Sequence, residues 1–515
     1  MSDELYAFRR NVVLVASAGT GKTHALVGVL VHALLGVSDL APRKGVDPAR
    51  VAATTFSRKA AAEIRERLVT ELERLAFGAP SAYEADLARA ATRLEMPWGP
   101  AVCAARSREA LARVELATIG TLHGLAYSVA RTHALALGLP PSFTVASQDE
   151  SDAWASASVE AAMVERAARD PDAVRDLLRA MRGTERARDE IVRLLGQLEE
   201  DGREAASLVL PEGDAQFLER RMTALLDAAR AATADARYAE AARALLDARE
   251  RGDVHEIAEA ASELLGIRKA RDKPDWLSFR EDLRGASNRE RAHGLVYAWA
   301  ARDRAVPSAA LVRDLLARAQ TLLAEAHARA GAVGFGAALR LARDALRDDP
   351  VAAARASGAY DALLVDEFQD TSRVQVDLLR LLWERDPRAR APGAMPVFGD
   401  YRPRGLLVVG DRKQSIYAFR GADVGVFVTT CVELAGERAR GALEIPSGTV
   451  ATPARATADF FALRENYRAN APLIAFVNAF SREALVGDGA DLSEARYAEA
   501  VESLLPSPTT PPARG

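Results

Sequence analysis

A small glycine-containing segment, ASAGTGKT, has the residue types that bind phosphate groups. It matches the pattern G-x-x-x-x-G-K-[ST] except at its first position, where alanine replaces glycine. Backbone N–H groups of such a loop point into one concavity at the N-terminus of the following helix. Lys22 would place its charge on the β- and γ-phosphates, and the hydroxyl of Thr23 would ligate Mg²⁺. We therefore expect a phosphate site formed by Ala16, Ser17, Ala18, Gly19, Thr20, Gly21, Lys22 and Thr23.

Two adjacent carboxylates follow an apolar segment much farther along the chain. Ala362–Val365 reads ALLV, and Asp366 and Glu367 come directly after it. Ligands of open α/β sheets bind at the carboxyl ends of the strands, so these acids would lie close to the bound phosphates. Asp366 would hold Mg²⁺, and Glu367 would orient and activate the attacking water. Together with the phosphate loop, this pair predicts hydrolysis of a nucleoside triphosphate.

A third cluster combines aromatic residues with arginine. The segment LLVVGDRKQSIYAFRGAD at Leu406–Asp423 contains Tyr417, Phe419 and Arg420. Aromatic side chains stack on bases and arginine contacts phosphates, which is how single-stranded nucleic acid is bound. The same spacing also fits a helix in which Phe419 packs into a core, so the residues by themselves leave both interpretations open.

The elements that must position these residues alternate between short apolar strands and helices. We expect strands at Asn11–Ala16, Val51–Phe56, Val114–Ile119, Ala362–Val365 and Leu406–Val409. Helices are expected over Thr23–Leu35 and from Lys59 to about Ala76. This alternation predicts an α/β fold with a parallel sheet covered by helices on both faces.

A long stretch rich in Ala, Arg, Glu and Leu separates the third strand from the fourth, and its composition favours helix. We therefore expect four parts. Residues 1–146 form the first part of the α/β domain, and residues 147–359 form an all-α insertion. Residues 360–480 form the second part of the α/β domain, and residues 481–515 form a C-terminal stub with a Pro-rich tail.

Composition and charge exclude several classes of protein and indicate the cellular compartment of this chain. Its 515 residues carry 68 Lys and Arg against 72 Asp and Glu, a net charge of −4, which excludes a generic polycation but permits a local basic groove. Two cysteines fit a reducing compartment. The N-terminus has no apolar signal region, and no apolar run reaches the roughly 18 residues of a membrane span. We expect a cytoplasmic protein without a membrane partner.

Six segments, in chain order, resemble the motifs of UvrD/Rep-like superfamily 1 DNA helicases, especially of the RecB/AddA branch. They are ASAGTGKT, TTFSRKAAAEIRERL, ATIGTLHGLAYSVAR, LLVDEFQDTS, VVGDRKQSIYAFRGAD and LRENYRANAPL. The resemblance implies a P-loop NTPase (RecA-like) motor domain that uses ATP and Mg²⁺ and acts on single-stranded DNA or a duplex end. It identifies the α/β parts above as motor domain and the helical stretch as an insertion domain.

The resemblance also implies roles for single residues. The catalytic group would be Glu367, which activates water, together with Gln414 and Arg468, which reach the γ-phosphate. Tyr467 would stack on adenine, and Thr23 and Asp366 would bind Mg²⁺. The DNA-contacting residues implied are Phe56, Thr121, His123, Tyr417, Phe419 and Arg420.

The chain departs from the family pattern at three places. Met1–Lys22 contains no glutamine, although many relatives read adenine with one there. The later family motifs do not occur in Ile474–Gly515, and no RecB-type nuclease segment is present. We therefore expect a truncated chain whose second motor domain is missing or only begun.

The leading hypothesis is the ATP-binding and ATP-hydrolysing part of a DNA helicase or translocase of repair or recombination. Its partners would be single-stranded DNA or a duplex end. A further partner would be a component of a helicase–nuclease complex or a chain that carries the missing motor domain. The alternative is a non-motor protein that uses ATP as a switch for binding single-stranded DNA or a partner. An unrelated P-loop ATPase is a third possibility, which six ordered motifs disfavour.

Overall fold

The computed structural model describes residues 2–181, 183–208, 236–251, 256–257, 259–260, 263, 302–415, 423–486, 492 and 497–507. These residues form two compact units. The first comprises Met1–Ala146, Glu199–Gly202 and Ala330–Gly515, and the second comprises Ser147–Leu198 and Arg203–Arg329. Within the described ranges, no helix combines the length and the apolar composition needed to cross a bilayer.

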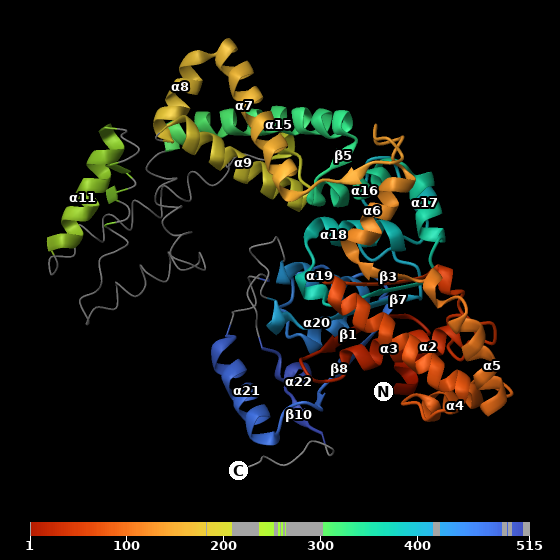
Figure 1. The fold of residues 1–515 in the computed structure, drawn as a ribbon. Coiled ribbons are helices and arrows are strands. Elements are labelled where there is room, and N and C mark those ends of the chain that lie inside the picture. Colours follow the sequence, from red (N-terminus) through yellow and green to blue (C-terminus); the bar gives the residue numbers. More distant parts are fainter. Residues whose placement is uncertain are drawn as a thin grey trace. The chain divides into compact units, whose positions relative to one another are not determined.

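A six-stranded, fully parallel sheet forms the centre of the first unit (Figure 1), in the order β3-β2-β6-β7-β1-β8. Its strands are β1 (Asn11–Ala16), β2 (Val51–Thr55), β3 (Thr118–Thr121), β6 (Ala362–Val365), β7 (Leu406–Gly410) and β8 (Ala458–Leu463). The expected α/β fold with a parallel sheet is confirmed. The central strands are buried along their whole length, because a parallel sheet with two covered faces requires apolar residues on both sides of each strand.

Helices cover both faces of this sheet, and alternate residues of each strand enter two different cores. In β1, Val13 and Val15 pack toward one core, and Val12 and Leu14 toward the other. The first core is covered by α6 (Leu122–Thr132), α16 (Phe335–Asp348), α17 (Pro350–Gly358), α18 (Arg373–Trp383), α19 (Val424–Ala435) and α20 (Glu437–Ala442). The second is covered by α1 (Ser2–Ala7), α2 (Lys22–Leu34), α3 (Arg58–Phe77), α4 (Glu84–Arg93) and α5 (Pro100–Leu111).

Short elements complete the first unit. They are β4 (Thr144–Val145), β5 (Ala332–Val333), β9 (Glu465–Asn466), α21 (Ala471–Ala484), α22 (Glu499–Glu502) and β10 (Leu505–Pro506). Six 3-10 turns are also present in the described chain: η1 (Pro48–Arg50), η2 (Val114–Leu116), η3 (Ala205–Ser207), η4 (Phe368–Asp370), η5 (Pro387–Ala389) and η6 (Arg412–Gln414). β4 pairs with β5, and β9 pairs with β10, both in parallel.

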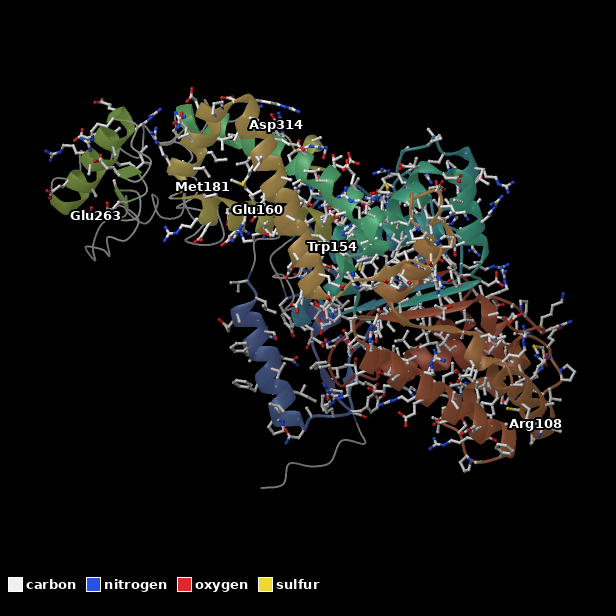
Figure 2. All side chains as sticks on the ribbon, turned by 45° about the horizontal axis from the view of Figure 1, so that its top comes forward. Arg108, Trp154, Glu160, Met181, Glu263 and Asp314 are labelled. Carbon is white, nitrogen blue, oxygen red and sulfur yellow. The ribbon has the colours of Figure 1, made fainter. Side chains whose placement is uncertain are left out.

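The second unit is helical in its described residues and has its own core. Its helices are α7 (Gln148–Arg169), α8 (Pro171–Ala180), most of α9 (Thr184–Asp201), α11 (Ala236–Arg251) and nearly all of α15 (Arg302–Ala330). A capping box of Ser147 and Glu150 begins α7. The core includes Ile191, Leu195 and Leu315. Trp154, Glu160, Met181 and Asp314 mark this unit in Figure 2, where Arg108 marks α5 of the first unit.

Three details differ from the sequence-based expectations. Residues 330–359, assigned to the insertion, lie in the first unit, because α16 buries Leu339 and Leu346, and α17 buries Ala352 and Ala353, in a core beside the sheet. The expected third strand, Val114–Ile119, divides into η2 and β3. The sequence-based expectations do not include β8, because ADFFAL contains a charged residue; in the structure its residues Ala458, Phe460 and Phe461 are buried.

Candidate active site

The phosphate loop runs from the end of β1 to the first residue of α2. Gly19 and Gly21 have positive φ angles of 79° and 87°, which glycine adopts without strain. A Cβ atom on Gly19 would lie 2.8 Å from Asn466 Nδ2 and 2.9 Å from the Cβ atom of Arg468, so no other residue fits there. Gly21 is the N-cap of α2 and offers no capping side chain. The first backbone N–H groups of α2 therefore receive no hydrogen bond from an N-cap side chain, and they can bind an anion.

Lys22 and Glu367 form an ion pair, although they lie 345 residues apart. Lys22 Nζ is 3.0 Å from Glu367 Oε1 and 2.9 Å from Oε2. The strands β1 and β6 end at the same edge of the sheet, and this brings the two residues together. Gln369 Nε2 donates to Glu367 Oε2 at 2.8 Å and fixes the carboxylate from a second side.

Asp366 is buried beside this pair at the end of β6. Burial, together with the charge of Glu367, raises the pKa of Asp366 to about 6, and Lys22 partly opposes this shift. A buried carboxylate that is destabilised by a neighbouring one is suited to a cation. Asp366 and the Thr23 hydroxyl supply hard oxygen donors of the kind that Mg²⁺ prefers, so the chemistry of these residues fits this metal.

A hydrogen-bond network extends from Glu367 to the expected γ-phosphate sensor. Gln369 Oε1 accepts from the backbone N–H of Asp411 at 2.9 Å, and Asp411 Oδ2 accepts from Gln414 Nε2 at 2.7 Å. Burial by itself would raise the pKa of Asp411, but the charge of Lys413 and the hydrogen bonds that the carboxylate accepts from Gln414 and from the Lys413 N–H bring this pKa below its usual value. Gln414 is thus linked to Glu367 through two side chains.

The segment after β8 lies directly on the phosphate loop. Asn466 Nδ2 donates to the carbonyl of Ala18 at 2.8 Å, and the N–H of Tyr467 donates to the carbonyl of Gly19 at 2.9 Å. The side chain of Tyr467 is 55 % exposed, and its hydroxyl donates to Glu465 at 2.8 Å. Tyr467 and the exposed Arg468 therefore lie at the mouth of the loop.

The expected DNA-contacting residues are placed only in part. Phe56 and His123 line one small cavity together with Asp366 and Glu367. Burial lowers the pKa of His123 to about 4, so its ring is neutral at neutral pH and would meet DNA without a charge. Thr121 accepts from the N–H of Gly124 and caps α6, which is a structural task. Tyr417, Phe419 and Arg420 lie outside the described residues.

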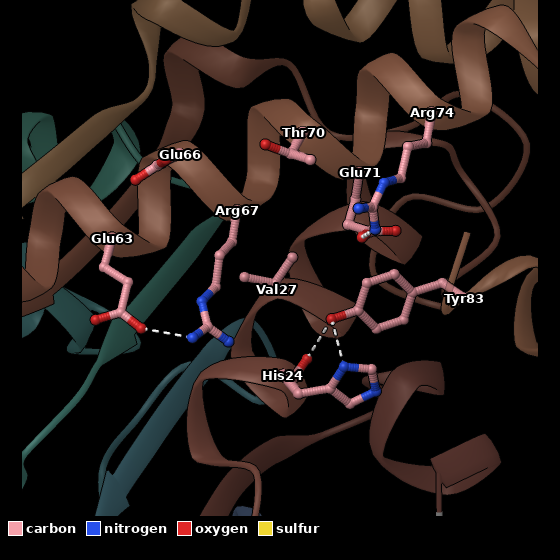
Figure 3. Close-up of a pocket in the computed structure, with 9 residues that line it drawn as sticks. All are labelled: His24, Val27, Glu63, Glu66, Arg67, Thr70, Glu71, Arg74 and Tyr83. Carbon is pink, nitrogen blue, oxygen red and sulfur yellow. Dashed lines mark hydrogen bonds and ion pairs between the residues drawn. The ribbon is translucent and has the colours of Figure 1, made fainter. Parts of the chain in front are cut away.

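A pocket of about 390 Å³ opens beside the first turn of α2 (Figure 3). It is lined by His24, Val27, Glu63, Glu66, Arg67, Thr70, Glu71, Arg74 and Tyr83. The rings of His24 and Tyr83 stack with centroids 4.6 Å apart, and the Tyr83 hydroxyl donates to the carbonyl of His24 at 2.7 Å. Arg67 pairs with Glu63 at 2.7 Å. Sequence reasoning did not single out this pocket; its only local signal is that His24 directly follows Thr23.

Comparison with known proteins gives one family and several relatives. The sequence model of the UvrD/REP helicase N-terminal domain matches residues 3–431. The chain is 31% identical to the RecBCD enzyme subunit RecB of Escherichia coli K12 over 29% of its length. It is 27% identical to an ATP-dependent helicase/nuclease subunit from Moorella thermoacetica over 82% of its length. These matches cover 12% and 31% of the relatives, so the chain spans about a third of their length or less.

Proposed function

The chain belongs to the UvrD/Rep helicase family, and from that premise we propose that it is the ATP-binding and ATP-hydrolysing part of a DNA helicase or translocase. Its substrate would be single-stranded DNA in repair or recombination, and its location would be the cytoplasm. The observation that carries the proposal is the ion pair of Lys22 and Glu367, at 2.9 Å, between the phosphate loop and the acid pair.

The residues of this site divide the work of ATP hydrolysis. Lys22 would leave Glu367 for the phosphates, and the Glu367 carboxylate would then accept a proton from the attacking water. Thr23 and Asp366 would hold Mg²⁺, which neutralises phosphate charge when bound. Tyr467, exposed at the mouth of the loop, is the residue we propose for stacking on the base. Hydrolysis thus depends on a switch of partners by Lys22.

Coupling to DNA is supported by one shared cavity. Phe56 and His123, which the family motifs assign to DNA, line it together with Asp366 and Glu367. A base or backbone that displaces Phe56 or His123 would therefore disturb the walls of the hydrolytic site. We propose this cavity as the route by which single-stranded DNA changes the rate of hydrolysis.

The proposal is tested on the purified full chain with Mg²⁺–ATP and oligo(dT). We expect ATP binding, slow turnover and a faster rate when oligo(dT) is added. A non-hydrolysable ATP analogue should change the affinity for oligo(dT) by about 5- to 150-fold, the usual range of coupling between two sites. Nucleotide-dependent DNA binding without turnover would favour the ATP-switched binding protein instead. Binding of neither ligand would contradict both functions.

An apolar face of α21 supports a protein partner. Leu473, Phe476, Val477 and Phe480 recur at helical spacing, and Phe476 and Phe480 are 65% and 62% exposed. α21 lies between the parallel strands β9 and β10 in the chain, and these form a two-stranded sheet in the part of the chain that the structure describes. All-parallel sheets usually have helices on both faces, and an isolated pair of strands is marginally stable. We propose that a polypeptide carrying a second α/β domain packs here, as part of a helicase–nuclease complex.

This partner is tested by producing the chain together with the polypeptide encoded directly downstream of it. We expect the two to co-purify, and the double variant Phe476→Glu/Phe480→Glu to lose that association, because two buried carboxylates would lack partners. Phe77→Glu is the matched control, since Phe77 is 79% exposed on α3. Co-purification that survives the double variant would exclude this face as the contact.

A further inference from the structure

A lysine outside the phosphate-binding motif contacts the phosphate loop. Lys413 Nζ lies 2.9 Å from Ser17 Oγ, and the Lys413 side chain is only 11% exposed. Ser17 is buried, and its carbonyl accepts from both the N–H and the hydroxyl of Thr20. Ser17 also helps to lower the pKa of Asp411. Ser17 is therefore fixed within the loop by its backbone and fixed to the end of β7 by its side chain.

Three oxygen partners lie within 3.3 Å of the ammonium nitrogen of Lys413. These partners are Ser17 Oγ at 2.9 Å, the carbonyl of Glu502 at 3.3 Å and Asp411 Oδ1 at 3.3 Å. A lysine offers three donors and no acceptor. Lys413 is engaged by these three oxygens in this arrangement, so its contribution would be to hold Ser17 and Asp411 in place.

Glu502 anchors this arrangement from the C-terminal segment Tyr497–Ser507. Its carboxylate forms a two-point ion pair with Arg412, at 2.9 and 3.1 Å, and lies 3.9 Å from Lys413 Nζ. Both side chains of the Arg412–Glu502 pair are buried. Burying two charges is costly, and such pairs are weak devices for stability but can specify one conformation. The segment is thus held in one position against η6.

The same segment reaches the phosphate loop by a second route. The N–H of Ser507 donates to the carbonyl of Asn466 at 3.2 Å, and Asn466 Nδ2 donates to the carbonyl of Ala18 at 2.8 Å. Ser17 and Ala18, two neighbours in the loop, are therefore connected to the middle and to the C-terminal end of this segment, at Glu502 and Ser507. The segment Tyr497–Ser507 thus contacts the phosphate loop through Lys413 and through Asn466, and the contact through Lys413 depends on the position of Glu502.

We propose that Lys413 is a positioning residue of the nucleotide site and that Glu502 holds it against Ser17. The segment Tyr497–Ser507 then contributes to triphosphate binding, because its residue Glu502 holds Lys413 in place. Asp411, which Lys413 also holds, accepts from Gln414, so loss of Lys413 should affect a triphosphate more than a diphosphate. This inference rests on the proposed function, because it refines the site that binds ATP.

The test compares nucleotide binding by the full chain and its variants Lys413→Ala, Ser17→Ala and the double variant. A fluorescent ATP analogue and its ADP counterpart serve as probes. Losing a charge-assisted hydrogen bond predicts about tenfold weaker ATP binding by Lys413→Ala and a smaller change for ADP. If Lys413 acts through Ser17, the double variant should bind no more weakly than Lys413→Ala, whereas independent sites would add. Lys44→Ala, at an exposed lysine, is the control.

Two further variants test whether the Glu502 carboxylate holds Lys413 in place. Glu502→Gln keeps the shape of the side chain but removes its charge, and we expect it to weaken ATP binding in the same direction as Lys413→Ala. Glu499→Gln is the matched control, since Glu499 lies in the same short helix and pairs with Arg482 in solvent. Thermal unfolding without nucleotide is recorded for every variant, so that a loss of folding is separated from a loss of binding.

Three outcomes decide the inference. Non-additive losses that are larger for ATP support it. Binding by Lys413→Ala within about twofold of the unchanged chain, or losses that multiply in the double variant, would overturn it while the proposed function stands. Failure of the unchanged chain to bind either probe would overturn the proposed function and this inference together.

Discussion

Replacing Lys22 by alanine should abolish measurable binding of Mg²⁺–ATP. Lys22 follows the αL residue Gly21 at the start of α2, and its ammonium group lies at the edge of the sheet where the phosphates would bind. Removing one charge-assisted contact in a half-buried site costs up to about 3 kcal/mol, and each 1.4 kcal/mol is tenfold in affinity. We therefore expect a loss of up to about 100-fold, measured by isothermal titration calorimetry or a fluorescent analogue.

The variant must be separated from a folding defect. Lys22 is paired with Glu367 without nucleotide, so its loss leaves a partly buried carboxylate that keeps only the hydrogen bond from Gln369. Lys22→Met retains the length of the side chain and should lose binding to the same extent as Lys22→Ala. Lys44→Ala should bind as the unchanged chain does, because Lys44 is exposed. ATP binding by Lys22→Met within threefold of the unchanged chain would contradict the role of Lys22.

Replacing Glu367 by glutamine should separate binding from hydrolysis. The carboxylate is held in an unusual backbone position, with φ at 52°, and its two oxygens face Lys22 and Gln369. An amide cannot take up the proton of the attacking water, and general-base catalysis contributes roughly 10²- to 10⁴-fold. We expect single-turnover hydrolysis to fall by about that factor, measured in the presence of oligo(dT).

Binding by the same variant should be preserved or become tighter. Glutamine has no negative charge to compete with phosphate for Lys22, although partial exposure of Glu367, at 30%, keeps this gain small. The matched control is Glu437→Gln, in which an exposed glutamate of α20 loses its charge. Unchanged turnover by Glu367→Gln would refute water activation by this residue, and a loss of ATP binding would show that its carboxylate is needed to build the site.

Much of the sheet could be predicted because the composition of several short segments indicates buried strands. Asn11–Ala16, Ala362–Val365 and Leu406–Gly410 are short apolar runs, as a parallel sheet covered on both faces requires. The strand β8 carries Asp459 and lies at the edge of the sheet, so its pattern is weaker. The end of the insertion could not be read either, since α16 has the composition of an insertion helix and only its packing assigns it to the first unit.

The candidate site could likewise be predicted only in part from the sequence. Local backbone requirements are visible in the sequence: Gly19 and Gly21 adopt positive φ angles, and a strand, a loop and a helix follow one another. Contacts across hundreds of residues are not visible. No spacing indicates that Lys413 meets Ser17 or that Glu502 pairs with Arg412, because neither residue has a local pattern that depends on its partner.

The sequence by itself therefore determined the family, the α/β fold and the chemical types gathered in its motifs. Each of these is encoded in short segments whose backbone and burial follow from their own residues. Only the tertiary structure decided which charges face one another. Lys22 meets Glu367 because two parallel strands end at one edge of the sheet, and the segment with Glu502 joins them through a buried ion pair. Such pairings depend on the packing of the whole unit, and no short segment of the sequence specifies them.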